Sequence, residues 1–183
     1  MKILKTLPTE EQKIEIVNLF FENFSKIFQN LKLFSKDNKK LLEYLGKNLN
    51  YENVICIINE DEIIGVLGFK VINKSFINYK RSNFIEVFGH FGGNYRYLSN
   101  MFIGFFESVP KKDEIVIEMV AVNSKFRSMG IGTLLINQIL DIGKKEKKSK
   151  ILLEVVNTNP RAKFLYEKLG FQVKKKTYFG FNI

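Results

Sequence analysis

Cysteine, histidine and tryptophan are the residue types that this chain largely lacks. Its 183 residues contain one cysteine, one histidine and no tryptophan. A single cysteine cannot form an internal disulfide, and one cysteine with one histidine cannot supply the usual ligands of a zinc site. We therefore expect no metal. Cys56 lies in an apolar run, residues 54–58, which is typical of a buried thiol in a reducing cytoplasm.

A long hydrophobic run is also missing. No stretch approaches the about 18 consecutive apolar residues that mark a membrane-spanning helix. The N-terminus becomes polar too soon for a signal peptide. Apolar residues make up 45% of the chain and charged residues 26%, which are ordinary globular values. These features predict one soluble, cytoplasmic domain over residues 1–183, with no membrane partner.

Arginine is scarce, whereas lysine is abundant. The net charge is +10, and lysine runs occupy residues 144–150 and 174–176. The first run falls at the end of a predicted helix, where cations complement the helix dipole. Nucleic-acid binding is an alternative interpretation, but no RNA-binding aromatic motif or helix-turn-helix spacing is present. We expect the charge to aid solubility and to attract small polyanions, and we expect no nucleic-acid partner.

The first part of the chain alternates between strand and helix patterns. Thr9 and Gln12 form a capping-box pattern behind Pro8. The helix that they open has one apolar face: Ile14, Val17, Phe20 or Phe21, Phe24, and Ile27 or Phe28. The surrounding patterns predict a first strand at residues 2–7, a second helix at 37–45, and a hairpin with strands 54–58 and 63–72.

Residues 75–112 are rich in aromatic side chains. Phe84 and Phe88 are one helical turn apart, and a second apolar stripe follows at helical spacing: Leu98, Met101, Phe102 and Phe105. We predict two short helices, separated at Gly92-Gly93 and packed over the edge of the sheet. Their aromatic residues either cover the core or form a lid or wall of an acceptor pocket. His90 is interpreted as a surface or turn residue, with a catalytic role as the alternative.

From residue 114 onward the patterns predict strand, helix, strand and helix. Strand 115–122 would place one set of side chains on one face, Val116, Glu118, Val120 and Val122, and the other set on the opposite face, Ile117, Met119 and Ala121. A helix over residues 130–147 would bury Ile131, Leu134 or Leu135, Ile139 and Ile142. A strand at 151–156 follows.

The last helix has a clear start and end signal. Asn159 is the predicted N-cap, Pro160 occupies the first helical position, and Gly170 is the predicted left-handed cap. Strands at 172–175 and 177–181 would form a closing hairpin.

A short basic turn with two glycines connects strand 115–122 to the helix that follows. The N–H groups at the start of a helix lack partners, and the helix dipole favours negative charge there. Gly130 and Gly132 let a phosphate approach the backbone without a Cβ in the way. The turn therefore predicts an anion site. It is neither a Walker loop, which needs Gly-Lys-Ser/Thr, nor a dinucleotide fingerprint, which needs a third glycine.

The spacing Arg127-x-x-Gly130-x-Gly132 resembles the acetyl-CoA pyrophosphate loop of the GNAT N-acetyltransferase superfamily, Gln/Arg-x-x-Gly-x-Gly/Ala. The later motifs are similar to the fifth strand, the fourth helix and the entry to the sixth strand of that family: Leu153-Glu154-Val155, Asn157, Asn159, Ala162, Tyr166 and Leu169-Gly170-Phe171. The resemblance spans residues 115–173, the expected acetyl-CoA-binding core. Two departures are the bulky pair Ser128-Met129 and Ser124 in place of a usual proline.

The resemblance implies an α/β (α+β) GNAT fold. Its mixed, mostly antiparallel twisted sheet would have six or seven strands, flanked by helices. A V-shaped splay would separate the fourth and fifth strands. The helical insertion at residues 75–112 would lie between the third and fourth strands of a single-domain, bacterial-type member.

The resemblance also implies a set of residues that contact acetyl-CoA: Val120, Ala121, Val122, Arg127, Ser128, Met129, Gly130, Ile131, Gly132, Thr133, Asn157, Asn159 and Tyr166. The pantetheine arm would pair with the backbone at Val120 and Val122, and an N–H near Val120 could polarise the thioester oxygen. Arg127 either contacts phosphate or faces solvent. Asn159 caps its helix and, by resemblance, also contacts the cofactor.

Three residues are the candidate catalytic groups. Tyr166 matches the family tyrosine that protonates the leaving thiolate, and a phenol with a pKa near 10 holds its proton at neutral pH. Glu118 and Glu154 are each a carboxylate inside an apolar strand, where burial would raise the pKa toward neutrality and suit a general base. Both stay open as the base, and a salt-bridged structural acid is the alternative for each. Tyr166 has the alternative of a core tyrosine.

These expectations predict an acetyl-CoA-dependent N-acetyltransferase. A primary amine of a small molecule, peptide or protein would attack bound acetyl-CoA directly in a ternary complex, releasing CoA. A cysteine relay is not expected, because Cys56 lies in a different strand. The alternative is a non-catalytic acyl-CoA-binding module or sensor. The expected partners are acetyl-CoA and an amine acceptor, and the chain would be a monomer or a homodimer.

Overall fold

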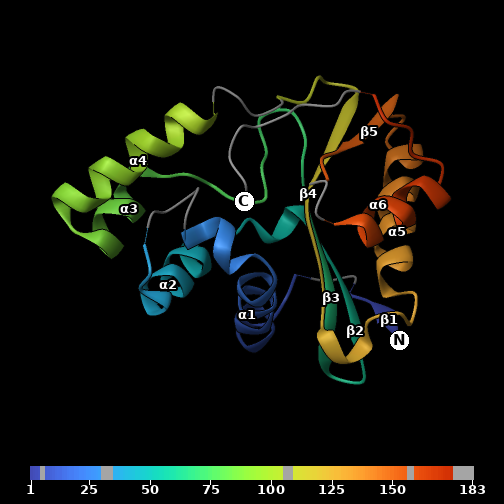
Figure 1. Cartoon of the computed structure of the whole chain (residues 1–183), viewed down its shortest axis with the longest axis horizontal. Helices are drawn as coiled ribbons and strands as arrows, with labels where there is room; N and C mark the ends of the chain where they lie inside the picture. The colour runs from blue at the N-terminus through green and yellow to red at the C-terminus, as the bar shows by residue number, and fades with distance from the viewer. Residues whose placement is uncertain (5–6, 30–34, 105–108, 156–158, 175–183) are drawn as a thin grey trace. The chain divides into compact units, whose positions relative to one another are not determined.

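The structure is a computed structural model and describes residues 1–4, 7–29, 35–104, 109–155 and 159–174 (Figure 1). The chain divides into two compact units, Met1–Leu153 and Glu154–Ile183, which are described separately. The single-domain organisation stays a prediction.

In the described residues a mixed sheet of five strands, where six or seven were predicted, forms the centre of the first unit. Its strands lie in the order β1-β2-β3-β4-β5, which are Lys2–Ile3, Val54–Asn59, Glu62–Lys70, Glu114–Val122 and Lys150–Leu153. The first four strands pair antiparallel, and β4 pairs parallel with β5. The predicted α/β class and the mostly antiparallel sheet are confirmed.

The strand limits differ from the prediction at both ends of the chain. β1 covers two residues where six were predicted. β5 ends at Leu153, so Glu154 and Val155 follow the strand rather than extend it. In the predicted closing hairpin, residues 172–174 carry no strand, and residues 175–181 lie outside the described part of the chain.

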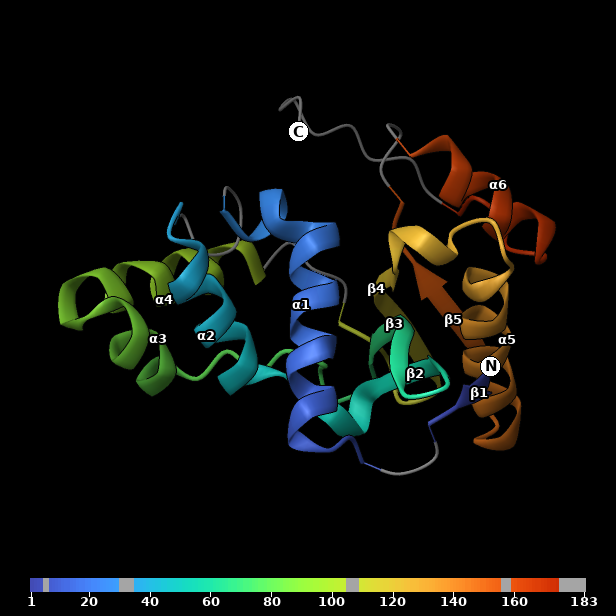
Figure 2. The same ribbon diagram turned by 90° about the horizontal axis from the view of Figure 1, so that it is seen from below.

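Helix α1 (Glu10–Ile27) covers one face of the sheet, and α2 (Asn38–Asn48) packs on α1 and on α3 (Arg81–Phe88) (Figures 1 and 2). The predicted capping box is present, because Thr9 Oγ1 accepts from Gln12 N–H at 3.3 Å and Gln12 Oε1 accepts from Thr9 N–H at 3.0 Å. Asp37 is the N-cap of α2, and its Oδ1 accepts a hydrogen bond from Lys40 N–H at 3.2 Å. Burial follows the predicted α1 face at Val17 and Phe20, but Ile14 is 63% exposed and does not belong to it.

Helix α5 (Ile131–Lys145) covers the opposite face of the sheet, as both views show. Its buried side chains are Ile131, Leu135, Ile136 and Ile139. The sequence left open whether Leu134 or Leu135 is buried. Leu135 is buried, whereas Leu134 is exposed. The close approach of α5 requires glycine on the sheet: a Cβ at Gly65 would lie 2.5 Å from Ile131 Cγ2.

Helices α3 (Arg81–Phe88) and α4 (His90–Gly104) form the insertion between β3 and β4. They separate at Gly89, whose φ of 75° ends α3. The predicted break at Gly92-Gly93 is wrong, because both glycines lie inside α4. The reason is steric: Gly93 is packed against the α3 backbone, where a Cβ would lie 2.5 Å from Phe84 O. A close helix crossing needs glycine as much as a turn does.

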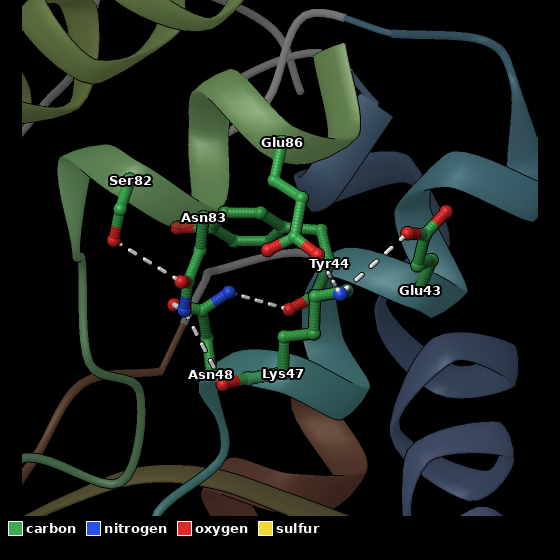
Figure 3. Close-up of polar contacts among 7 residues, drawn as sticks. All are labelled: Glu43, Tyr44, Lys47, Asn48, Ser82, Asn83 and Glu86. Atoms are coloured by element: carbon green, nitrogen blue, oxygen red, sulfur yellow. Dashed lines mark hydrogen bonds and ion pairs between the residues drawn. The ribbon is translucent and has the colours of Figure 1, made fainter. Parts of the chain in front are cut away.

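The insertion packs on α2 rather than over the edge of the sheet. The ring of Tyr44 lies 4.6 Å from that of Phe84, centroid to centroid. Figure 3 shows the polar contacts at this junction, where Lys47 Nζ lies 2.5 Å from Glu86 Oε1 and Asn83 Nδ2 donates to Asn48 Oδ1 at 2.9 Å. Phe76 and Phe84 are fully buried, so the interpretation of aromatic core cover holds for them.

We predict opposite effects for two glycine-to-alanine substitutions. Gly93→Ala should destabilise the fold by about 2 to 3 kcal/mol, because the new methyl group overlaps the α3 backbone. Gly46→Ala, inside α2, meets no atom within 4 Å and should stabilise it by about 0.5 to 1 kcal/mol. Urea unfolding of both variants measures this. Equal midpoints would contradict the close helix crossing.

In the described residues, no helix is both long and apolar enough to cross a membrane.

Candidate active site

Strand β4 loses regular pairing on both of its edges at Glu118. Toward β5, the parallel pairing runs from Glu114 to Ile117 and stops there. Toward β3, Ile117 pairs with Phe69 and Met119 pairs with Gly68, so Glu118 is the extra residue of a β-bulge. Bulges of this kind occur beside active sites, where they redirect a side chain. The pairing stops at Ile117 because β5 ends at its partner Leu153, so the V-shaped splay that the resemblance implied stays a prediction.

The bulge also changes which side chains share a face. The predicted alternation placed Glu118 with Val120 and Val122, and this is wrong beyond residue 118. Ala121 belongs to the buried cluster on the α1 side, and Met119 packs against it. Glu118 reaches the same side, where it contacts the backbone of Phe76. One extra residue reverses the alternation of a strand, and strand periodicity alone does not reveal it.

Glu118 is held by three neighbours. Lys70 Nζ lies 3.5 Å from Glu118 Oε1, and both side chains are largely buried. Ser75 Oγ donates to Glu118 Oε2 at 2.9 Å, and Phe76 N–H donates to the same oxygen at 3.4 Å. The Glu118 carboxylate and burial together raise the pKa of Tyr79, with burial the larger cause. The salt bridge that was the alternative interpretation of Glu118 is therefore present; its catalytic role stays a prediction.

Lys70, Ser75 and Tyr79 are site neighbours that the sequence reasoning missed. Lys70 is the last residue and the one cation of β3, and its register partner is Val116. A cation in this mostly apolar strand, beside a strand that carries Glu118 among apolar residues, was a usable signal. Ser75 and Tyr79 come from the loop before α3 and gave no signal.

The turn after β4 leads into α5 through residues in left-handed conformation. A short 3₁₀ helix, η3 (Ser124–Phe126), is capped by Asn123, whose Oδ1 accepts from Lys125 N–H at 3.1 Å. Ser128 then has φ of 67° and Gly130 has φ of 81°. Asparagine, aspartate and glycine are the usual residues at such angles, so Ser128 is locally strained.

The N-terminus of α5 has free donors and open space. The first helical bond runs from Leu134 N–H to Gly130 O at 3.0 Å, so the N–H groups of residues 130–133 have no partner within the helix. The N-cap Gly130 supplies no side-chain cap, and a Cβ built there would meet nothing within 4 Å. This arrangement suits a phosphate group.

The side chains of the turn contribute less than its backbone. Arg127 does not simply face solvent, because its Nη2 donates to Asn23 Oδ1 on α1 at 3.0 Å. Met129 is exposed. Val120 and Val122 are partly buried, and Ala121 is buried on the α1 side. Ile131 points into the core, while Gly132 and Thr133 are partly buried.

The second unit carries the remaining predicted residues. Helix α6 (Pro160–Lys168) begins as predicted: Asn159 Oδ1 accepts from Ala162 N–H at 3.1 Å, and Gly170 has φ of 90°. Tyr166 is partly buried, with its ring edge-on to Phe171 at 6.0 Å, and burial raises the pKa of its phenol. Glu154 is exposed, contrary to the expected burial. Asn157 lies outside the described residues.

Two further sequence interpretations concern His90 and Cys56. His90 is exposed at the start of α4, which fits a surface residue. Cys56 is buried, and burial raises the pKa of its thiol to about 12. Within the ranges that the structure describes, no three His, Cys, Asp or Glu side chains are grouped to hold a metal ion.

Comparison with known families gives the class of protein. The model of the acetyltransferase (GNAT) family matches residues 14–171. The chain therefore belongs to the GNAT family of acetyltransferases. No curated protein matches it significantly.

Solved structures share the fold. An N-acetyltransferase from Staphylococcus aureus Mu50 has a TM-score of 0.61 at 18% identity, covering 97% of this chain and 94% of that one. The aminoglycoside acetyltransferase meta-AAC0020, from an uncultured soil metagenomic sample and in complex with trehalose, has a TM-score of 0.58 at 18% identity, covering 100% and 95%. A tetramutant of the BH1408 protein from Bacillus halodurans has a TM-score of 0.59 at 18% identity, covering 98% of each chain. At such identities the likeness shows the fold alone.

The residues of the first unit fit the acetyl-CoA that the family uses. The open N-terminus of α5 offers backbone donors for a diphosphate. The edge of β4 beyond Ile117, which β5 leaves unpaired in the described residues, offers backbone groups for an extended arm.

Proposed function

We propose that the chain is an acetyl-CoA-dependent N-acetyltransferase that acts directly on a primary amine of a small molecule or peptide in a ternary complex. One observation carries the proposal: β4 loses its β5 partner at Ile117 and then leads, within one turn, to an uncapped helix N-terminus. An extended chain with an anionic end fits this combination of free strand edge and free helix donors.

The cofactor-binding role falls mainly on the backbone. Val120 to Val122 would pair with the pantetheine arm, and residues 128–133 would surround the diphosphate. Arg127 would act indirectly, since its hydrogen bond to Asn23 ties the turn to α1. Asn159 caps α6, and we retain a cofactor contact for it and for Asn157 as part of the proposal.

The catalytic roles fall on a proton acceptor and a proton donor. When bound, acetyl-CoA supplies an activated acetyl thioester that a neutral amine can attack. Glu118 would accept a proton from the acceptor ammonium, directly or through water, while Ser75 and Lys70 hold the carboxylate in place. Tyr166 would hold a proton for the leaving sulfur, which its raised pKa favours. Glu154 is retained as the alternative base.

A silent acyl-CoA-binding module is the second candidate. The observation in its favour is the full engagement of Glu118 by Lys70, Ser75 and Phe76, as expected for a structural acid. Turnover separates the two. If acetyl-CoA binds but no amine or peptide in a broad panel releases free thiol, the binding module is supported and the enzyme proposal fails.

We predict that charge at position 130 decides cofactor affinity. Asn and Asp both tolerate the left-handed conformation of Gly130, and a Cβ added there would meet no atom within 4 Å. Gly130→Asp should bind CoA roughly 10 to 100-fold more weakly than Gly130→Asn, because a carboxylate would face the diphosphate. Equilibrium titration with CoA at low salt measures the ratio. Equal affinities for this isosteric pair would place the diphosphate elsewhere.

A further inference from the structure

Helix α4 presents a stripe of large apolar side chains to solvent. Phe91 is 91% exposed, Tyr95 61%, Leu98 63% and Phe102 66%. The four positions are separated by four, three and four residues, so they lie on one face along most of the helix. Met101, beside the stripe, is also exposed. Single exposed apolar residues are ordinary, but a continuous set of this size marks an interaction surface.

The inner face of α4 is already used by the fold. Gly93 meets the α3 backbone, and the ring of Tyr97 contacts Phe84 edge-on at 5.9 Å. Arg96 lies over the ring of Phe88 at 4.6 Å and donates to Gly92 O at 3.0 Å. The stripe is therefore the other side of the helix, and core packing does not account for it.

The stripe is uncharged, unlike most of the molecule. Arg96 is the only Asp, Glu, Lys or Arg among the residues of α4, and it turns toward Phe88. The whole chain carries a net charge of +10, so two copies repel each other across most orientations. Contact through α4 brings together faces without charge and minimises this repulsion. One cation from another helix borders the stripe, since Arg81 Nε donates to Asn94 Oδ1 at 2.8 Å. An anionic membrane or an acidic peptide would need several cations beside the apolar residues, and α4 itself has no lysine.

The exposed apolar area of the stripe is large enough for an interface between two copies. At these exposed fractions the three aromatic side chains alone offer roughly 400 to 500 Å². Leu98 and Met101 add to this, so that two copies together reach about 1,200 Å², the lower end of a standard protein–protein interface. Interface cores are rich in aromatic residues and methionine and poor in charge, as this stripe is.

We infer that the occupant of the α4 stripe is a second copy of this chain, which forms a two-fold symmetric dimer through Phe91, Tyr95, Leu98 and Phe102. In a two-fold contact the residues near the axis meet their own equivalents. Leu98 lies near the middle of the stripe and therefore close to the axis. The dimer does not depend on the acetyltransferase reaction, and no residue of the stripe is among the catalytic or cofactor-binding residues proposed above.

Sedimentation over a range of micromolar concentrations tests the dimer. We expect the mass to rise from 21.4 kDa toward twice that value as the concentration increases. Leu98→Glu should weaken the association roughly 100-fold or more, because it buries two carboxylates at the axis. Ile14→Glu is the matched control, since Ile14 is a helix residue with the same exposed fraction of 63% and should leave the association unchanged. Circular dichroism confirms that each variant is folded.

Cross-linking gives an independent readout. Cys56 is buried and burial raises the pKa of its thiol to about 12, so it reacts slowly in the native protein. Leu98→Cys then introduces the reactive thiol, and a short bis-maleimide should yield covalent dimers, whereas Ile14→Cys should not. Three results would overturn the inference: a monomer at all concentrations, a dimer that Leu98→Glu leaves intact, or a monomer that floats with anionic lipid vesicles.

Discussion

Replacing Tyr166 by phenylalanine is expected to lower kcat roughly 100-fold or more and to leave CoA affinity unchanged. The substitution removes only the hydroxyl, because the aromatic ring and its edge-on contact with Phe171 are retained. Burial raises the pKa of Tyr166 above its ordinary value of 10.0, so the phenol keeps its proton at neutral and mildly alkaline pH. The alkaline decline of kcat that this group causes should therefore have its midpoint above the ordinary pKa of a phenol and be absent in Tyr166→Phe.

Steady-state release of free thiol and equilibrium binding of CoA measure the two quantities separately. Phe164→Leu, at an exposed position of the same helix, is the matched control and should keep wild-type turnover. If Tyr166→Phe retained full kcat, the proton donor would be another group, and Tyr166 would be a packing residue of α6.

Replacing Glu118 by glutamine is the second large effect that we expect. Glutamine can still accept from Ser75 and Phe76 but cannot take a proton from the acceptor, so kcat should fall roughly 100-fold. The affinity for acetyl-CoA should stay the same, because the proposed diphosphate site is the backbone at the start of α5. Initial rates with a saturating amine and calorimetric titration with CoA make the comparison.

Two controls separate a base from a structural acid. Lys70→Gln breaks the same ion pair from the other side and leaves the carboxylate in place. If Glu118 serves only the fold, both variants should lower the unfolding temperature alike and leave kcat unchanged, which would contradict the proposal. Glu154→Gln tests Glu154, the exposed alternative to Glu118 as general base. If Glu154→Gln lowered kcat more than Glu118→Gln does, Glu154 would be the general base.

The parts of the fold with local signals could be predicted from the sequence. Thr9 with Gln12, Asp37, and Asn159 with Pro160 each mark a helix start through hydrogen bonds to residues three positions away. The strand and helix around Gly130 followed from apolar periodicity and the glycine spacing. These signals involve neighbours in sequence, so a single chain is enough to reveal them.

The missed features depend on distant contacts. The bulge at Glu118 is defined only by the register of β3 against β4. The predicted break was Gly92-Gly93, and only the packing of α4 on α3 shows that the chain turns at Gly89 and that Gly93 lies at the helix crossing. The hydrogen bond from Arg127 to Asn23 joins residues 104 positions apart. Helical spacing placed Leu98 and Phe102 on one face but could not tell that this face is exposed.

Calorimetric titration of the folded wild-type chain with CoA and with acetyl-CoA tests the central claim most directly. We expect saturable heat with both ligands, since the N–H groups of residues 130–133, which have no partner within the helix, should bind the diphosphate that the two have in common. No heat with either ligand at millimolar concentrations would contradict the account of this site.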